Sequence, residues 1–454
     1  MTSPADSAAA IAATRFGLGP LPGELTTIAP DPKEWVLRQL RRQPAATPAG
    51  PGFGGSLPSG AAMVTAMLEA RRDRKLGQDD AAAGARDEIR TVYRAEVAAR
   101  MGAAINAQTP VIERLVQFWS NHFTVSCMRP VVRGFCGAFE REAVRPHILG
   151  RFPDMLLAVV RHPAMLFYLD NVASVGPDSP FGERSGKGLN ENLGREILEL
   201  HTLGVDGGYT QADVEALARI LTGWTVARPK DPAPGGFRFE PRIHEPGPKL
   251  LLGRTYAEAG LAEGEAALLD LARHPATARH VAKKLAHHFI ADDPPPAAVE
   301  RIAQRFTATG GDLRQVTTAV VEEEAAWKRP FAKVRTPTEL VIAACRAVGL
   351  ANPPADGLVN SLRVLDQPAF FAPSPAGWPD IAAAWVSPEA MIRRAEWCQA
   401  FAQRLPDPPD PMSVAAASFG DALLPEEMLQ AVRRAPDRRT GLALLLASPE
   451  FQKR

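Results

Sequence analysis

Acidic, basic, amide and imidazole side chains gather at helical spacing in residues 188–204, GLNENLGREILELHTLG. On an α-helix each residue advances about 100° around the axis, so five of these side chains project from one side and a histidine follows at the end. Carboxylates held beside an arginine can transfer protons or ligate a metal ion. The group comprises Glu191, Asn192, Arg195, Glu196, Glu199 and His201.

A purely structural interpretation also fits this group. Glu191, Arg195 and Glu199 have i,i+4 spacing, which on a solvated helix face stabilises by about 0.2–0.5 kcal/mol per pair. The preceding loop, residues 168–188, favours a binding role, because its glycines let backbone approach a ligand closely. The segment after the helix is structural, since Thr210 and Asp213 have the spacing of a capping box.

The first hypothesis is a metal-dependent hydrolase. Helical bundles build metal sites from inward-facing Glu and His, and a divalent ion, the cofactor this hypothesis needs, lowers the pKa of its bound water. The chain lacks an HExxH motif, and Glu199 and His201 are two residues apart, so a straight helix points them differently. The predicted catalytic residues are Glu196, Glu199 and Arg195, the predicted substrate-binding residues are Asn121, Asp170, Asn171, Asn192, Trp224 and Lys249, and the predicted metal ligands are His122, His201, His244 and Glu199.

Two alternatives stay open. A metal-free, glycosidase-like enzyme needs two carboxylates about 5–9.5 Å apart, which Glu196 with Glu199 or Glu245 can supply. A non-catalytic binding or assembly protein instead uses the Glu, Arg and His side chains as a buried polar network that fixes helix register. Other histidines have ordinary interpretations: His274 begins a helix, and His287 and His288 are surface or packing residues.

Composition excludes several classes of function. The 454 residues carry a formal net charge of +1, with 46% hydrophobic and 23% charged residues, which is typical of a soluble globular protein and not of a nucleic-acid binder. The Walker A and GxSxG motifs are absent, which disfavours ATP binding and an α/β-hydrolase. The GxGxxG match GPGFGG at 50–55 lies in a Pro/Gly-rich loop and not after a predicted strand, which disfavours dinucleotide binding. The four cysteines are expected to be free and buried, and Cys127 can pair with Cys136 only if the fold brings the two together.

No run approaches the roughly 18 apolar residues that span a bilayer, so no membrane span is expected. The first 20 residues lack the positive region of a secretory signal, which predicts a cytoplasmic location.

Helical periodicity of apolar residues dominates, and alternation typical of strands is scarce. The pattern predicts an all-α fold, a large multi-helix orthogonal bundle with Pro/Gly-rich loops at 43–60 and 228–250 and at most a short β-hairpin, for which FRFEPRIH is the candidate. One large helical domain, 1–454, is the preferred organisation, and a C-terminal helical subdomain at 331–454 is the alternative. The clearest predicted helices are 80–107, 110–121, 211–223, 274–290 and 381–405.

Eight segments carry a resemblance to a known family. They occur in the order RFGLGP, FWSNHFTVS, YLDNVASVGPDSP, NENLGREILELHTLGVDGGYTQADV, LTGWTV, IHEPGPKLLLG, HPATARHVAKKL and GWP. Together they resemble the bacterial domain of unknown function 1800 family over nearly the whole chain. The sequence departs from the family pattern at Glu245, where Asp is frequent.

The resemblance implies one helical domain of this length and carries over no settled activity. It also implies a partner, because genes of this family commonly neighbour those of secreted sulfatase- or phosphatase-like proteins. The chain has matching residues at the motif positions Asn121, His122, Asn192, Arg195, Glu196, Glu199, His201, Trp224, His244, Lys249 and His274.

Overall fold

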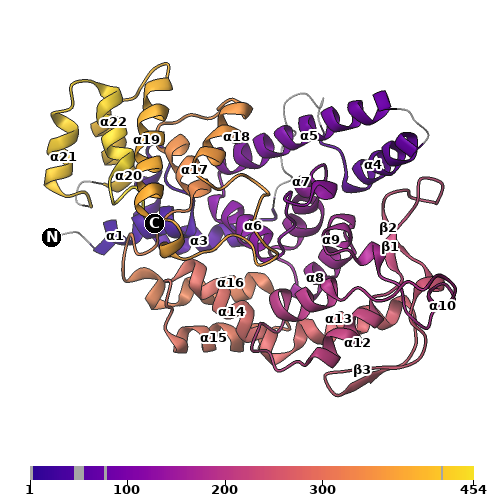
Figure 1. Ribbon diagram of the computed structural model, residues 1–454. Coiled ribbons are helices and arrows are strands. Elements are labelled where there is room, and N and C mark those ends of the chain that lie inside the picture. The colour runs from indigo at the N-terminus through magenta and orange to yellow at the C-terminus, as the bar shows by residue number, and fades with distance from the viewer. Residues whose placement is uncertain (1–3, 45–55, 76–78, 421–422) are drawn as a thin grey trace.

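The computed structural model describes residues 4–44, 56–75, 79–420 and 423–454, so most of the predicted loop at 43–60 lies outside the described residues. The fold is all-α, as predicted: the described residues form 22 α-helices and two small antiparallel strand pairs (Figure 1).

The first half of the chain contains α1 (Pro4–Ile11), α2 (Glu24–Ile28), α3 (Pro32–Leu40), α4 (Gly60–Lys75), α5 (Asp79–Ile105), α6 (Pro110–His122), α7 (Cys136–Phe139), α8 (Phe152–Arg161), α9 (Pro163–Tyr168), α10 (Gly182–Ser185), α11 (Asn192–Glu196) and α12 (Gln211–Ile220). The strands follow as β1 (Trp224–Val226), β2 (Phe237–Phe239), β3 (Lys249–Leu251) and β4 (Arg254–Tyr256). The remaining helices are α13 (Leu261–Arg273), α14 (Pro275–Phe289), α15 (Pro296–Ala308), α16 (Leu313–Glu322), α17 (Pro337–Ala347), α18 (Ala355–Val364), α19 (Pro388–Arg404), α20 (Pro411–Phe419), α21 (Glu426–Arg433) and α22 (Arg438–Ala447).

Short turns of 3-10 or π helix connect or extend these elements. They are η1 (Ala12–Phe16), η2 (Pro130–Val132), η3 (Glu140–Val144), η4 (Arg145–His147), η5 (Asn171–Ala173), η6 (Ile197–His201), η7 (Pro241–Ile243), η8 (Glu324–Trp327) and η9 (Ala382–Ala384).

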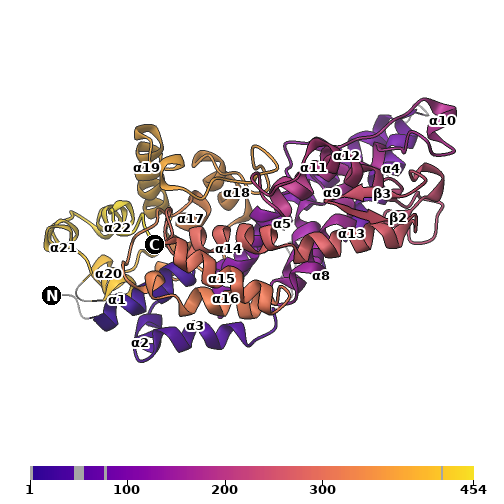
Figure 2. The ribbon, with the colours of Figure 1, turned by 90° about the horizontal axis from the view of Figure 1, so that it is seen from below.

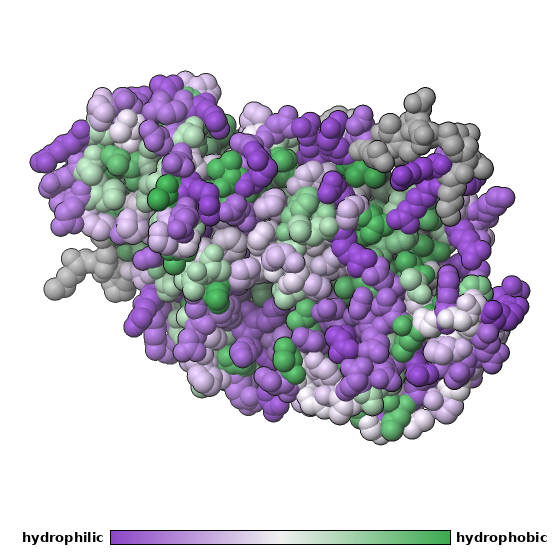
Figure 3. All heavy atoms as spheres, in the orientation of Figure 1, coloured by the Kyte–Doolittle hydropathy of each residue, from purple (hydrophilic) through white to green (hydrophobic). Residues whose placement is uncertain are grey.

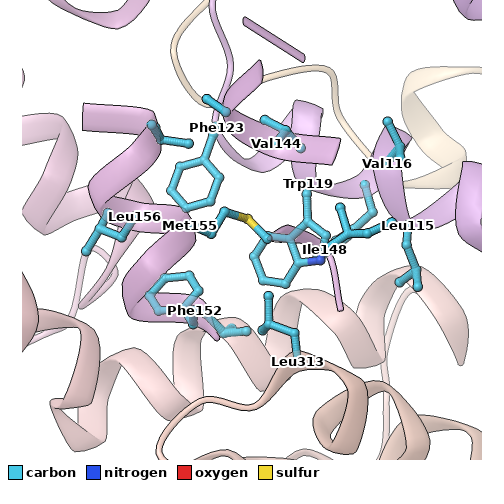
Figure 4. Packing of buried hydrophobic residues seen from close by; sticks show 14 of the residues in the cluster. Leu115, Val116, Trp119, Phe123, Val144, Ile148, Phe152, Met155, Leu156 and Leu313 are labelled. Carbon is cyan, nitrogen blue, oxygen red and sulfur yellow. The ribbon is translucent and has the colours of Figure 1, made fainter. Parts of the chain in front are cut away.

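The larger hydrophobic core surrounds α6, which is buried along most of its length. Trp119 lies at its centre and contacts Phe123 and Phe152, while Met155 and Leu313 approach from α8 and α16 (Figure 4). Aromatic rings bury the largest apolar area per residue, so this cluster holds α6 firmly at its C-terminal end. That end carries Asn121 and His122.

A second hydrophobic cluster joins the C-terminal helices to α5. Val97, Met101 and Ile105 of α5 pack with residues of α17 through α22, among them Leu340 and Leu442. In the view of Figure 2, α19, α21 and α22 occupy one end of the elongated molecule and α10, β2 and β3 the other. The region predicted as a C-terminal subdomain therefore shares its core with an N-terminal helix.

Local signals placed most helix ends correctly. Pro110 is in the first turn of α6, Asp312 caps α16, and Thr210 with Asp213 forms the predicted capping box of α12. The helix predicted at 381–405 begins only at Pro388, because the Ser387 side chain accepts a hydrogen bond from Ala390 N and sets a new N-terminus there.

The strands lie in and beside the loop predicted at 228–250. β1 pairs with β2, with Trp224 opposite Phe239, and β3 pairs with β4, with Lys249 opposite Tyr256. The predicted strand segment FRFEPRIH supplies β2 and the turn η7.

On the face seen in Figure 3, hydrophilic residues cover most of the outline and hydrophobic residues form scattered patches. None of the helices in the described part of the chain combines the length and the apolar character needed to cross a bilayer.

Candidate functional site

Helix α14 builds one wall of a cavity of about 790 Å³. Its buried side consists of Ala278, Val281, Ala282, Leu285 and Phe289. His280, Lys284 and His288 recur every four residues, which places them on one face, and all three line the cavity. His274 caps the start of the helix by accepting a hydrogen bond from Ala276 N, as predicted for a helix-entry turn.

Three further segments supply most of the remaining lining: the end of α6, the turn at 203–206, and residues 367–380, which we call the cavity loop. Single residues of α5 and α15 and the start of α17 complete the cavity. Helix α14 contributes only basic and imidazole groups among its charged lining side chains, which are Arg279, His280, Lys283, Lys284, His287 and His288. The other charged or imidazole side chains that line the cavity are Arg100, His122, Asp206, Glu339 and Asp380. The apolar lining comes from the other walls, with Phe118, Val125, Leu203, Phe370, Ala372 and Trp378. The cavity is therefore cationic on one side and apolar on the other.

Lys284 is the half-buried ammonium group in this wall. Desolvation lowers the pKa of Lys284 to about 8, and the attraction of Asp380 only partly opposes the shift. No residue in the described part of the chain forms a hydrogen bond or an ion pair with Lys284. An amine that has lost part of its water without gaining a counter-ion is the kind of group that a ligand can complete.

A cluster of neutral imidazoles lies next to Lys284. The rings of His201 and His280 are centred 6.4 and 6.0 Å from that of His122. Burial first, and then the charge of Lys284, lowers the pKa of His201 to about 3 and that of His280 to about 4. These imidazoles are therefore uncharged near neutral pH.

Backbone contacts fix the orientation of two of these rings. His122 Nε2 donates to the carbonyl oxygen of His201 at 3.2 Å, and His280 Nε2 donates to that of Leu200 at 3.0 Å. Both contacts require the tautomer with hydrogen on Nε2. Gly204 has φ +86°, and a Cβ there would lie 2.7 Å from His280 Nδ1, so any larger residue at this position would collide with the imidazole ring.

An ionic network lies at the base of the cavity. Asp380 accepts a hydrogen bond from His288 Nδ1 at 2.6 Å and pairs with Lys333 at 3.3 Å and Arg454 at 3.5 Å. Burial alone would raise the pKa of Asp380, but these partners hold it well below its usual range. Glu339 pairs with Arg454 and Arg114, which outweigh burial and lower its pKa to about 2. Both carboxylates are thus committed to partners other than Lys284.

The predicted catalytic residues lie elsewhere. Glu196, Glu199 and Arg195 are half-buried on α11 and η6, and none of them lines the cavity. Arg195 donates to Glu191 at 2.8 Å and to Gln211 at 3.0 Å. Burial, and then the charge of Glu199, raises the pKa of Glu196 to about 7.

The helix containing these residues is not straight. Its last turn, η6, is π-helical, and wide turns of this kind reorient the side chains that follow. His201 is completely buried against His122, whereas Glu199 stays half-exposed. Neither ring nitrogen of His201 has a hydrogen-bond partner in the described part of the chain.

The four predicted metal ligands do not lie together in one site. His122 and His201 lie beside the cavity, while His244 contacts Glu263 at 3.3 Å and the carbonyl of Thr222 at 2.8 Å. Lys249 joins the His244 centre, 3.2 Å from Glu263. Within the part of the chain that the structure describes, no three His, Cys, Asp or Glu side chains form a group that could hold a metal ion.

The predicted substrate-binding residues are also dispersed. Asn121 lines the cavity, Asn192 is exposed on α11, and Asp170 pairs with Arg129 at 2.6 Å. Asn171 is buried, and its side chain donates hydrogen bonds to the carbonyls of Leu221 and Trp224 at 3.1 and 2.8 Å. These bonds hold the turn between α12 and β1. Trp224 is fully buried against Phe237.

Glu245, the carboxylate of the second alternative, is buried and committed to protein groups. It forms an ion pair with Arg219 and accepts a hydrogen bond from Asp178 N at 3.0 Å.

With this geometry established, the chain was compared with known proteins. The model of a family described as "Protein of unknown function (DUF1800)" matches residues 11–453. The chain belongs to the DUF1800 family. No curated protein and no solved structure matches it.

In this DUF1800 chain, sequence reasoning did not identify Lys284, His280, His288 or Asp380 as site residues. The signal in the sequence was the four-residue spacing of His280, Lys284 and His288, which puts these residues on one helix face beside the apolar face of the same helix. The sequence interpretation treated His287 and His288 as surface or packing residues, whereas both line the cavity. Cys127 and Cys136, both buried and free, are brought together by the fold, with their sulfurs 3.0 Å apart.

Proposed function

We propose that this protein binds an anionic organic small molecule in the cavity beside α14. The observation that carries the proposal is the half-buried Lys284 ammonium, which lines the cavity and has no counter-ion among the described residues. A carboxylate, phosphate or sulfonate group placed against it restores the electrostatic stabilisation that the amine lost with its water. Lys283, on the same helix, adds a second charge without an ion-pair partner in the described chain.

The opposite walls indicate the rest of the ligand. Phe118, Phe370 and Trp378 present aromatic side chains to the cavity, and Val125 and Leu203 extend this apolar surface. Pockets of about 300–1,000 Å³ that combine apolar walls with a few polar groups are typical small-molecule sites. The ligand we propose therefore carries an anionic group on an apolar, preferably aromatic, body.

The metal-dependent hydrolase has less support, because His244 is held by Glu263 in a centre separate from His122 and His201. The metal-free acid and base enzyme is a second candidate, favoured by Glu196, whose raised pKa of about 7 beside Glu199 suits proton transfer near neutral pH. A sulfatase- or phosphatase-like partner and a cytoplasmic location stay predictions.

Isothermal titration calorimetry with 4-methylbenzoate, 4-methylphenyl phosphate and 4-methylbenzenesulfonate tests the proposal. At least one of these anions should bind to the wild-type protein, and Lys284→Met should weaken its binding at least tenfold. Lys33→Met changes an exposed lysine outside the cavity and should leave binding unchanged. Equal binding by Lys284→Met, or no binding of any of the three anions to the wild-type protein, would contradict the proposal.

A further inference from the structure

We propose that Lys284 is a covalent site, whose amine forms an imine with the carbonyl group of an aromatic aldehyde or ketone that also carries an anionic group. This inference rests on the proposed function, since the same cavity must first hold the anion. It concerns a bond-forming reaction that anion binding alone does not require.

The position of the amine is the first argument. Lysine amines react with carbonyl compounds only in the uncharged form, and a hydrophobic pocket without a counter-ion favours that form. The carboxylate whose charge acts on Lys284 is Asp380, which is already held by His288, Lys333 and Arg454. Lys284 is therefore free to lose its proton, and its pKa of about 8 agrees with this geometry.

The second argument is that a cation stays available after Lys284 has reacted. Lys283 and Arg279 also line the cavity and are exposed at their positions on α14. They can hold the anionic group while Lys284 is bonded to the carbonyl carbon. Arg279 lies 3.9 Å from Glu300, but a ligand with only a carbonyl group would leave Lys283 without a partner among the described residues.

The third argument is proton handling. In the reaction, the nitrogen lone pair of Lys284 forms the C–N bond, and the π electrons of the carbonyl move to its oxygen. One proton passes from the nitrogen to this oxygen, which gives a hydroxyl group. The hydroxyl takes up a second proton and leaves as water while the nitrogen lone pair forms the C=N bond, and loss of the remaining amine proton gives the neutral imine. His280 lines the same wall one helical turn before Lys284, and because Nε2 donates to Leu200, its Nδ1 is the acceptor nitrogen. It is the positioned group that can accept the proton and return it to the leaving hydroxyl.

The test uses 4-formylbenzoate with sodium cyanoborohydride, which reduces an imine to a stable secondary amine, followed by peptide mass spectrometry of the full-length protein. We expect one dominant adduct on Lys284, and an excess of 4-methylbenzoate, which has the anion without the aldehyde, should suppress it. Labelling spread evenly over exposed lysines, with none concentrated on Lys284, would overturn the inference.

Lys284→Arg separates the two proposals, because arginine keeps the positive charge and cannot form this imine. The variant should still bind 4-methylbenzoate in calorimetry and should lose the adduct, while Lys283→Arg should keep it. If the wild-type protein binds 4-methylbenzoate but gives no adduct on Lys284, the covalent inference fails and the binding function stands. If neither binding nor an adduct is found, both fail.

His280→Gln checks the role of the imidazole. The amide of glutamine can keep the contact to Leu200 but takes up no proton at neutral pH. We expect the adduct to form at least tenfold more slowly with unchanged affinity for 4-methylbenzoate. An unchanged rate would exclude His280 as the proton acceptor.

Discussion

Asn121 and Trp378, 257 residues apart in the chain, exchange two hydrogen bonds. Asn121 Nδ2 donates to the Trp378 carbonyl at 2.9 Å, and Trp378 N donates to Asn121 Oδ1 at 2.7 Å. Gly377 has φ +85°, and a Cβ there would lie 2.5 Å from the Asn121 carbonyl oxygen, so the close approach requires glycine. Asn121, which was predicted to bind substrate, thus uses its side chain to hold the backbone of the cavity loop.

Asn121→Ala should loosen the cavity loop. The change leaves two partly buried backbone groups of Trp378 without partners, at a cost of about 1–3 kcal/mol in the free energy of unfolding. Hydrogen exchange at the Trp378 amide should become faster, and urea denaturation should report the loss. Asn192→Ala, at an exposed position, is the control and should leave both unchanged. Equal exchange at Trp378 in both variants would show that Asn121 does not hold the loop.

Gly204→Ala should destabilise the protein more than Gly208→Ala. Both glycines have positive φ, +86° and +83°, so both variants carry the backbone strain of the left-handed region. Only at position 204 would the new Cβ meet His280, while no atom lies within 4 Å of a Cβ at 208. We expect an additional loss of about 1–3 kcal/mol for Gly204→Ala in urea denaturation. Equal losses would mean that His280 moves aside without cost.

Breaking the ionic network at the base of the cavity should be costly. Glu339→Gln leaves the buried Arg114 without its carboxylate and Arg454 with Asp380 alone, and the loss of one member of a buried pair typically costs about 3–5 kcal/mol. Glu426→Gln removes an exposed partner of Arg433 and should cost no more than about 1 kcal/mol. The urea denaturation midpoints of the two variants measure the difference, and a Glu339→Gln midpoint like that of Glu426→Gln would contradict this role.

The stability of the protein should rise with pH in the range where Lys284 titrates. Its folded pKa of about 8 lies below the value of about 10.4 expected for an unfolded lysine, so between these values the unfolded state binds more protons. The penalty for the buried charge is complete below pH 8 and is relieved as the pH rises toward 10.4. Lys284→Met removes it, so the Tm at pH 7 should rise by about 1–3 °C.

The matched measurement is a series of thermal melts from pH 7 to pH 10.5 on the wild-type protein, Lys284→Met and Lys33→Met. The advantage of Lys284→Met should shrink as the pH rises, and Lys33→Met should follow the wild-type protein. A constant difference between Lys284→Met and the wild-type protein at every pH would show that the charge of Lys284 is not responsible.

Glu196 should have the opposite pH dependence. Its folded pKa of about 7 lies above the unfolded value of about 4.3, so folding favours the protonated carboxyl. This contribution is complete below pH 4.3 and is lost as the pH rises through 7. Because Glu196 is half-exposed, we expect Glu196→Gln to raise the Tm at pH 8 by only about 1–2 °C. Tm values at pH 5 and pH 8 check this, and a larger gain at pH 5 would contradict the sign.

Local patterns predicted much of the fold. Apolar periodicity and caps located α5, α6, α12 and α14 with small errors at their ends, because each depends on contacts within a few residues. The start of α19 was placed too early, since Ser387 and Pro388 override the alanine-rich run before them. The straight-helix geometry of the predicted site missed the π turn that buries His201.

The sequence by itself determined the helical class, the caps and the family, because short-range periodicity and ordered motifs express all three. Only the tertiary structure decided which polar groups share a cavity. Asn121, Lys284 and Asp380 are separated by many residues and by several helices, and their meeting depends on how α6, α14 and the cavity loop pack. The same packing removes water from Lys284 without supplying a counter-ion, and no local sequence pattern encodes this result.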